Sequence, residues 1–392
     1  MPNYIGSNQL TKMYLGDTEI VKAYIGGQEV YSSAPAGPVN YGITQKSILE
    51  HNTTQGRYSR IDKLDDNHVV ISYVSTSGLE VKVFTIASDL SVSETSSLLV
   101  DAAGTDGIVT ALDSSHFAVA YTGSGYDGYI ASFSVDAEYA ITKLYSREHD
   151  DKNGLNNSLV LVDATHLILA YRGSWDRGCI KTFAIDGSYN ITDIHLLTHD
   201  NAEYTGWNSL GKLDDSHYAL AYLNNAAALR IKVFTIDGSY NITATSSLTA
   251  EADTVSGIGS LSILDSSHFA VSYTISYSLW QGNLKTFSVD AANSYTITCE
   301  DTLRFSSGKG QDSSLIALNV NHLMVAYADS DYDGRLLVLS LDASHDITKG
   351  AEIEHDTVYA RQNSLVLLTP VVVALAYSCD GDDGCIKVFE LD

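Results

Sequence analysis

One phrase recurs along the whole chain at a nearly constant spacing. It has the form Leu-Asp-x-x-His, then four apolar residues, then Tyr. Copies begin at Leu64, Leu112, Val162 (Val in place of Leu), Leu213, Leu264 and Leu318 (Asn319 in place of Asp), and a copy without Asp and His begins at Leu368. The steps between the closing tyrosines, Tyr73 to Tyr377, are 48, 50, 51, 51, 54 and 50 residues. Only strand-like segments lie within this period, so the sequence predicts an all-β, seven-bladed β-propeller with four-stranded blades.

The third repeat shows how one blade is expected to be built. Its four strands are predicted over residues 158–162, 166–171, 179–185 and 189–197. Asp, Gly and Ser occupy the turns between them, because Asp carboxylates accept bonds from nearby backbone amides and Gly accepts positive φ.

Large and small side chains alternate along the second strand of a repeat. Phe117, Val119 and Tyr121 point to one face, and Ala118 and Ala120 point to the other. We therefore expect the bulky face of each blade to pack on the alanine face of its neighbour.

The two ends of the repeat region complement each other. Residues 384–392 read as a third strand with no fourth strand after it, while residues 41–51 align with the fourth strand at 189–199. The early strand is predicted to complete the last blade, which closes the ring and removes two open sheet edges.

Three regions follow from these patterns: a β-rich segment at 1–31, a small-residue, Pro-containing linker at 32–39, and the propeller at 40–392. In the first segment a Tyr-(Leu/Ile)-Gly pattern returns every ten residues, which is typical of short strands ended by glycine turns. So small a segment cannot bury its own apolar face and is expected to need a partner surface. The candidate attachment or oligomerisation residues are Tyr4, Tyr14, Tyr24, Ile25 and Tyr31.

Charge excludes one class of partner. With 23 Lys and Arg against 48 Asp and Glu, the formal net charge is −25, so nucleic acid is not expected as a partner. No apolar run is long enough for membrane insertion, and the first ten residues lack the basic and apolar regions of a signal peptide.

Cysteine usage does not indicate a disulfide framework. Cys379 and Cys385 flank one predicted hairpin turn and can pair, whereas Cys179 occupies the Cys385 position of another repeat without such a partner. Free thiols in strands are the favoured interpretation.

The loops at one face of the predicted propeller vary in length and composition, as binding loops on a rigid scaffold do. All three tryptophans fall there, with Tyr and Arg neighbours that suit sugar stacking or a protein partner. The candidate binding residues are Tyr58, Trp175, Arg177, Tyr204, Trp207, Tyr277, Trp280, Tyr359 and Arg361. The alternative is that these large side chains merely seal the loop bases.

The start of the first strand of each blade lies at the central mouth of that face. The positions around the ring are Tyr58, Asp106, Asn156, Trp207, Ile258, Asp312 and Gln362. The side chains at these positions differ in chemical character from blade to blade. This is compatible with the binding of one asymmetric ligand, or with random divergence of the repeats.

Histidine returns in six repeats, at His68, His116, His166, His217, His268 and His322. A residue that recurs once per blade serves each blade alike, and copies on separate blades lie too far apart to share one ion. We expect these histidines to hydrogen-bond the turn between the first two strands to the neighbouring blade.

One string matches the opening of a calcium loop, with Asp329, Asp331 and Asp333 as candidate ligands. The Glu expected at the twelfth position is Ser340, so a solvated acidic turn is the competing interpretation. Apart from Ca²⁺ no cofactor is expected.

No Ser, Cys or His stands in a recognisable nucleophile setting, and the sequence predicts a non-enzymatic protein.

The stretch IGSNQLTKMYLGDTEIVKAYIGGQEVY, residues 5–31, resembles short modules of bacteriophage virion proteins, especially tail and fibre components. Blades such as LDSSHFAVAY resemble propellers of phage or bacterial surface proteins. The resemblance implies a virion structural protein (tail fibre, tail tip or capsid decoration), made in the host cytoplasm without a signal peptide. Its implied partners are other virion proteins or further copies of the chain through the N-terminal segment, and a host-surface glycan or protein at the variable face. The alternatives are a secreted or surface bacterial propeller, lectin-like or glycan-cleaving, and a structural spacer without a ligand.

Overall fold

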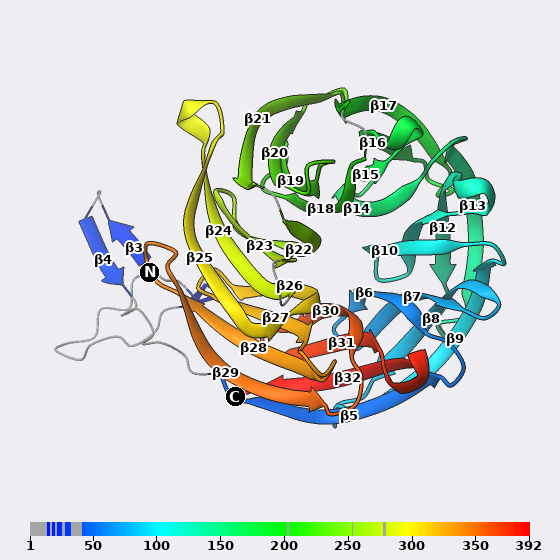
Figure 1. Ribbon diagram of the computed structural model, residues 1–392. Coiled ribbons are helices and arrows are strands. Elements are labelled where there is room, and N and C mark those ends of the chain that lie inside the picture. Colours follow the sequence, from blue (N-terminus) through cyan, green and yellow to red (C-terminus); the bar gives the residue numbers. More distant parts are fainter. Residues whose placement is uncertain are drawn as a thin grey trace. The chain divides into compact units, whose positions relative to one another are not determined.

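The computed structural model describes residues 41–201, 204–252, 254–276 and 280–392 with their side chains, and the backbone of four short strands before them. Seven four-stranded antiparallel sheets stand in a ring as the blades of a β-propeller (Figure 1), as the repeat predicts. Among the described residues no helix is long and apolar enough to cross a membrane.

The strands of each blade follow one another from the centre of the ring outward. Blade 1 contains β6 (Arg57–Asp65), β7 (His68–Ser75), β8 (Gly78–Ile86) and β9 (Val92–Asp101). Blade 2 contains β10 (Thr105–Asp113), β11 (His116–Thr122), β12 (Gly128–Val135) and β13 (Ile141–Asp150). Blade 3 contains β14 (Leu155–Asp163), β15 (His166–Arg172), β16 (Gly178–Ile185) and β17 (Ile191–Asp200). Blade 4 contains β18 (Gly206–Lys212), β19 (His217–Leu223), β20 (Leu229–Ile236) and β21 (Ile242–Glu251).

The remaining blades keep the same order. Blade 5 contains β22 (Val255–Asp265), β23 (His268–Ile275), β24 (Gln281–Asp290) and β25 (Thr296–Lys309). Blade 6 contains β26 (Gln311–Asn319), β27 (His322–Ala328), β28 (Gly334–Leu341) and β29 (Ile347–Asp356). Blade 7 contains β30 (Arg361–Thr369), β31 (Val372–Ser378), β32 (Gly384–Leu391) and β5 (Ile43–Asn52). Short 3₁₀ turns lie at Ser124–Tyr126, Ser174–Asp176, Ala291–Asn293 and Asp380–Asp382.

Ring closure is confirmed. β5 pairs antiparallel with β32, from Ile43 opposite Leu391 to Asn52 opposite Gly384. The amide of Gly42 also donates to the carbonyl of Asp392 over 2.9 Å. In Figure 1 the blue β5 lies along the red β32, so the start of the propeller completes its last sheet.

The blades pack face to face as the alternation predicts. Phe117 and Val119 of β11 belong to one buried cluster with Val83 of blade 1. Ala118 on the opposite face joins a second cluster with Leu167 of blade 3. Because both faces are covered, the middle strands are apolar throughout, whereas the outermost strand alternates between exposed and partly buried positions.

Serines tie the innermost strands together. The Ser158 hydroxyl of β14 accepts a bond from the Leu210 amide of β18 over 2.9 Å. Equivalent bonds run from Leu261 to Ser209, from Leu315 to Ser260, from Leu365 to Ser314 and from Ile61 to Ser364. Each bond joins the innermost strands of two consecutive blades. These strands are therefore linked by bonds from a backbone amide to a serine side chain.

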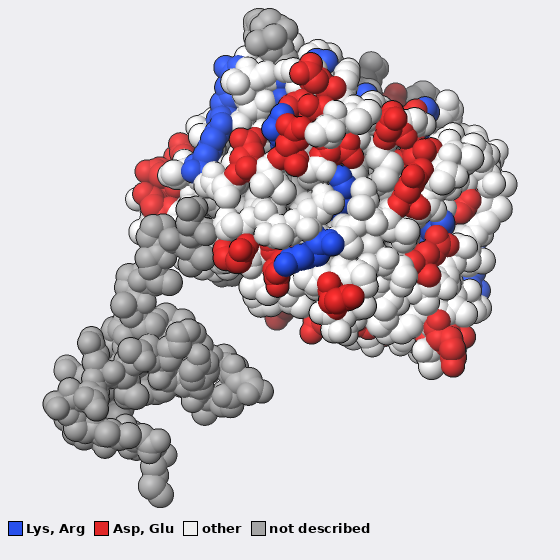
Figure 2. Space-filling view, turned by 90° about the horizontal axis from the view of Figure 1, so that it is seen from below, with Lys and Arg blue, Asp and Glu red and all other residues white. Residues whose placement is uncertain are grey.

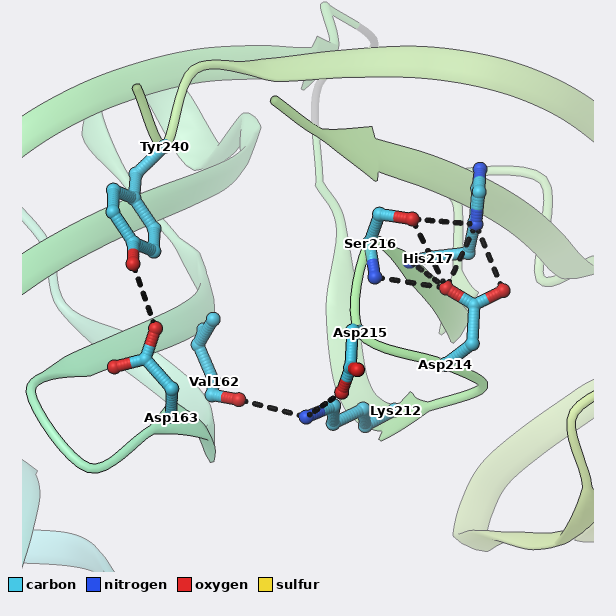
Figure 3. A network of polar contacts seen from close by, with 8 residues as sticks. All are labelled: Val162, Asp163, Lys212, Asp214, Asp215, Ser216, His217 and Tyr240. Carbon is cyan, nitrogen blue, oxygen red and sulfur yellow. Dashed lines mark hydrogen bonds and ion pairs between the residues drawn. The ribbon is translucent and has the colours of Figure 1, made fainter. Parts of the chain in front are cut away.

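The recurring histidines belong to a second link between blades, at the turns far from the variable face. His166 contacts Asp163 of its own blade at 2.8 Å and stacks on Tyr240 of the next blade, with 3.4 Å between ring centres. Tyr240 in turn donates its hydroxyl to Asp163 over 2.7 Å (Figure 3). The expected hydrogen bond from His to the neighbour is therefore replaced by a ring stack, and tyrosine makes the hydrogen bond. We call this three-residue arrangement the clasp.

Figure 3 also shows the next copy of the turn. His217 contacts Asp214 at 2.9 Å, and the nearby Lys212 donates to the carbonyl of Val162 in blade 3 over 2.8 Å. The lysine adds another polar bond between the same two blades.

A third link lies toward the outside of the ring and was missed in the sequence. Four buried histidines stand near the ends of outermost strands, at His51, His149, His199 and His355. Their ring nitrogens have no hydrogen-bond partner among the described residues. Lys181 donates to the carbonyl of His149 in the preceding blade over 2.9 Å, and Lys82, Lys232 and Lys387 repeat the contact with the other three. Burial, and then the nearby lysine charge, lower the pKa of each of these histidines to about 3.

The favoured interpretation of free thiols is wrong for one pair. Cys379 and Cys385 form a disulfide across the turn between β31 and β32, where their Cα atoms lie 5.9 Å apart. Antiparallel pairing places Cys385 directly opposite Tyr377, so the hairpin brings the two sulfurs within bonding range. Cys179 and Cys299 remain free, the first buried and the second exposed.

The chain divides into two units, residues 1–40 and the propeller unit of residues 41–392. In the first unit β1 (Tyr14–Leu15) pairs with β2 (Thr18–Glu19), and β3 (Lys22–Ile25) pairs with β4 (Gln28–Ser32). These are short hairpins of the kind that the ten-residue pattern predicts. Tyr4 lies outside the described residues.

Candidate functional site at the central mouth

A cavity of about 730 Å³ lies at the centre of the ring, lined by the first residues of every innermost strand. All seven positions predicted for the central mouth line it, from Tyr58 to Gln362. This volume lies within the range of small-molecule sites in proteins, about 300–1,000 Å³. The cavity is therefore the feature of the propeller best suited to hold a ligand.

The backbone at the mouth is unusual in six of the seven blades. Positive φ angles of 50° to 57° occur at Tyr58, Asp106, Asn156, Trp207, Asp312 and Gln362. Each innermost strand also shifts its register here, as between Thr105 and Ile108 of β10. A bulge of this kind re-aims side chains and is common beside binding sites. Ile258 of β22 is the exception, because the positive φ of blade 5 lies earlier, at Thr254.

Neighbouring blades hold these bulges in place. The Asp106 carboxylate accepts a bond from the Asn156 amide of the next blade over 2.5 Å. The Gln362 side chain accepts one from the Tyr58 amide over 2.6 Å, across the seam where blade 7 meets blade 1. Side chains at the mouth thus cap the backbone of the following blade, which makes the rim rigid.

Charged groups of both signs face the cavity. Arg361 pairs with Asp312 of the preceding blade over 2.5 Å. Arg60 makes no ion pair within 4 Å among the described residues, and its one hydrogen bond runs to the carbonyl of Ser59. Burial raises the pKa of Asp106, while Arg60 acts in the opposite direction. Figure 2 shows that charged groups of both signs are also scattered over one side of the propeller, although the chain as a whole has a net charge of −25.

Two aromatic rings stand at the rim of the cavity. Tyr58 is 46% exposed and Trp207 is 45% exposed, although both are large apolar side chains. Together with Arg361 they are the predicted binding residues that the structure brings to the central cavity.

The other predicted binding residues lie away from this cavity. Trp175 is 79% exposed in the 3₁₀ turn after β15, followed by the exposed Arg177. Tyr204 lies under the Arg172 guanidinium, 5.0 Å from its ring centre. Trp280 uses its carbonyl to accept the Gly310 amide over 2.9 Å. Tyr277 lies outside the described residues.

A smaller aromatic group stands near the mouth between blades 6 and 7. Tyr332 and Tyr359 lie 6.0 Å apart, and Lys309 and Arg361 approach the Tyr332 ring at 4.3 and 5.3 Å. Tyr359 also donates its hydroxyl to Asp382 over 3.3 Å. Through Tyr332 this group links Tyr359 to the cavity residue Arg361.

The predicted calcium ligands do not converge in this structure. The Asp329 carboxylate accepts the amides of Asp331 and Asp333 at 3.0 and 3.1 Å and pairs with Arg335 at 2.9 Å. These bonds are those of an acidic turn, and a calcium ion would compete with Arg335 for Asp329. Calcium binding at this loop stays a prediction.

Sequence reasoning missed part of the cavity lining. Arg60 and the asparagines Asn157, Asn208 and Asn363 line it, two or one residues beyond the predicted mouth positions. Counting onward from the start of each innermost strand gives their place in the sequence, but it does not show that they face the cavity. The bulge turns these further residues toward the axis as well.

No protein-family model matches the chain, and no curated protein matches it. Among solved structures it is similar to a protein from Lactobacillus plantarum, with 14% identity and a TM-score of 0.61, over 80% of this chain and 89% of that one. It is also similar to the periplasmic gluconolactonase of Pseudomonas aeruginosa, with 15% identity and a TM-score of 0.58, over 77% of this chain and 85% of that one. The shared feature is the propeller fold.

The expectation of a non-enzymatic protein is contradicted by this comparison. A chain of the same architecture is named as a gluconolactonase, so the lack of a recognisable nucleophile setting does not exclude catalysis on this fold. The similar structures named here are bacterial proteins, and a bacteriophage origin stays a prediction.

Proposed function

We propose that the propeller is a carbohydrate-binding domain whose ligand occupies the central mouth. The observation that carries the proposal is the cavity of about 730 Å³ with two exposed aromatic rings at its rim and charged and amide side chains on its wall. Aromatic rings stack on the C–H faces of sugars, and amide, carboxylate and guanidinium groups bond their hydroxyls. The volume suits a ligand of one or two sugar rings.

The rigidity of the rim favours binding. Because Asp106 and Gln362 fix the backbone of the next blade, the mouth side chains start from ordered positions. A site that is already ordered loses less conformational entropy when a ligand binds.

A second candidate is hydrolysis of a sugar-derived lactone, favoured by the gluconolactonase of the same fold. In such a reaction water adds to the ring carbonyl, a base takes the proton of that water, and the ring oxygen leaves with a proton. Asp106 is the group at the mouth that suits this proton transfer, because burial raises its pKa.

We further propose that the chain acts at the surface of a virus particle, with residues 1–31 as the attachment or oligomerisation segment and the propeller facing a host glycan. The support is the resemblance of residues 5–31 to virion modules. Tyr14, Tyr24, Ile25 and Tyr31 fall on the short strands of this segment. Antibodies against the propeller should label particles purified from lysates of cells that carry the gene, and unlabelled particles would remove this assignment.

The binding proposal is tested with the full chain on a glycan array, followed by calorimetry with the best sugar. Trp207→Ala should weaken binding about tenfold or more, because a stacked ring and its buried area are lost. Trp175→Ala is the matched control, since Trp175 is exposed but does not line the cavity. Equal loss in both variants, or no sugar bound at all, would contradict the central site.

The same samples separate the two candidates. Release of acid from aldonolactones by the natural chain, abolished in Asp106→Asn, would favour hydrolysis. Binding without turnover would favour the carbohydrate-binding function.

A further inference from the structure

One clasp differs from the others in its third residue. The ring positions that stack on the recurring histidines carry tyrosine at Tyr139, Tyr189, Tyr240 and Tyr295, and histidine at His345. His345 stacks on His268 with ring centres 3.8 Å apart. Where tyrosine offers a hydroxyl to the clasp, this position offers an imidazole nitrogen.

The substitution gathers three metal-ligating side chains. Asp265, His268 and His345 each place one ligand atom within 4.8 Å of the others, the one such group of three among the residues that the structure describes. His268 already contacts Asp265 at 3.0 Å. All three side chains are partly exposed, so an ion and its water ligands have access.

We propose that Asp265, His268 and His345 form a binding site for a divalent transition-metal ion, with Zn²⁺ as the expected occupant. Two imidazoles and one carboxylate are ligands that zinc prefers, and three protein ligands leave a position for water. Ligand atoms that share a tetrahedral zinc lie about 3.3 Å apart, given bonds of about 2.0–2.1 Å. A turn of the His345 ring out of its stack closes the remaining separation.

The surroundings suit a cation. Glu300 and Asp342 lie close enough to His345 to interact with its charge. The tyrosine clasps have only one imidazole beside the carboxylate and lack the third ligand.

The site is separate from the central cavity. β22 runs from the cavity at Ile258 to the clasp at Asp265, so the two lie at opposite ends of the strand. Zinc binding at this clasp is therefore independent of the proposed carbohydrate binding at the central mouth.

The test is calorimetric titration of the full chain with Zn²⁺, compared with His345→Tyr. This variant installs the residue that four equivalent clasps carry, so the propeller is expected to fold as before while one metal ligand is lost. The natural chain should bind one more Zn²⁺ than the variant, or bind it about tenfold or more tightly. Asp265→Asn, which keeps the shape of the side chain, should weaken binding in the same way.

A second readout is the visible absorption of Co²⁺, which reports nitrogen and oxygen ligands around the ion. The natural chain should develop the bands of a low-coordinate site, and His345→Tyr should not. Equal zinc binding by the natural chain and His345→Tyr, or no zinc bound by the natural chain, would overturn the proposal.

Discussion

The Tyr240 hydroxyl of blade 4 donates a hydrogen bond to the Asp163 carboxylate of blade 3 over 2.7 Å, while its ring stacks on His166. Tyr240→Phe keeps the stack and removes the hydrogen bond. Because Asp163 also bonds His166 and the Thr165 amide, it stays partly satisfied, and the free energy of unfolding should fall by about 1 kcal/mol. Denaturant unfolding measures this change.

Tyr295→Phe is the matched control. Tyr295 stacks on His217 at 3.8 Å, but among the described residues its hydroxyl has no hydrogen-bond partner. Its removal should leave the unfolding free energy nearly unchanged, and equal losses in both variants would show that the hydrogen bond of the clasp does not stabilise the ring.

The four buried histidines predict strong acid sensitivity. Their pKa is about 3 in the folded chain, whereas the ordinary pKa of histidine is 6.5, so the unfolded chain binds protons more readily between these values. Stability is fully present above pH 6.5 and is lost as the pH falls toward 3. Each histidine should contribute about 1.4 kcal/mol per pH unit below its unfolded pKa. Urea unfolding at pH 7.5, 6 and 5 measures the slope.

His149→Phe separates this effect from the carboxylates. The His149 ring makes edge contacts with Tyr171 and no hydrogen bond among the described residues, so phenylalanine can take its place. The slope between pH 6 and 5 should fall by about 1 kcal/mol per pH unit, which is the contribution of one such histidine. An unchanged slope would mean that His149 takes up protons in the folded state as readily as in the unfolded state.

Gly178 should not tolerate a side chain. A Cβ at this position would lie 2.5 Å from the Cε1 atom of the buried His199. Gly178→Ala is expected to cost about 1–3 kcal/mol of unfolding free energy through overpacking. Gly187→Ala in the same blade meets nothing within 4 Å and should be neutral or slightly stabilising, so equal effects of the two changes on the thermal midpoint would contradict the packing around His199.

Thiol reactivity should distinguish the four cysteines. Without reductant, the native chain should react at Cys299, because Cys379 and Cys385 are paired and Cys179 is buried with a raised pKa. A colorimetric thiol titration should count one fast thiol in the native chain and none in Cys299→Ser. Three fast thiols in the native chain would mean that the disulfide is absent.

Much of the fold could be predicted from the sequence, because each blade repeats the same sequence pattern and the same four strands. The phrase ending at Tyr171 placed β15 to within one residue, and the alignment of residues 41–51 with 189–199 predicted the pairing of β5 with β32. The ends of strands were less accurate. β14 starts at Leu155 instead of 158, since its bulge adds paired residues that the apolar pattern does not mark.

Side-chain partners were harder to predict than strands. Cys379 and Cys385 flank one hairpin turn, so the sequence allows their pairing, but the register of the hairpin is needed to show that they meet. The stacking of His166 on Tyr240 joins residues of different repeats, which periodicity alone does not connect. The place of Trp207 at the mouth was predicted from the repeat spacing. The place of Arg60 in the cavity lining was not, because it depends on how the bulge turns the strand.

The pairing of β5 with β32 has a consequence for synthesis on the ribosome. β5 is among the first propeller segments to emerge, and its partner is the last, so an unpaired strand must persist while six complete blades are translated. The polar, alternating exposed face of β5 limits wrong pairing during that wait. Closure of the circle is therefore expected to follow translation, as the final step in the maturation of the chain.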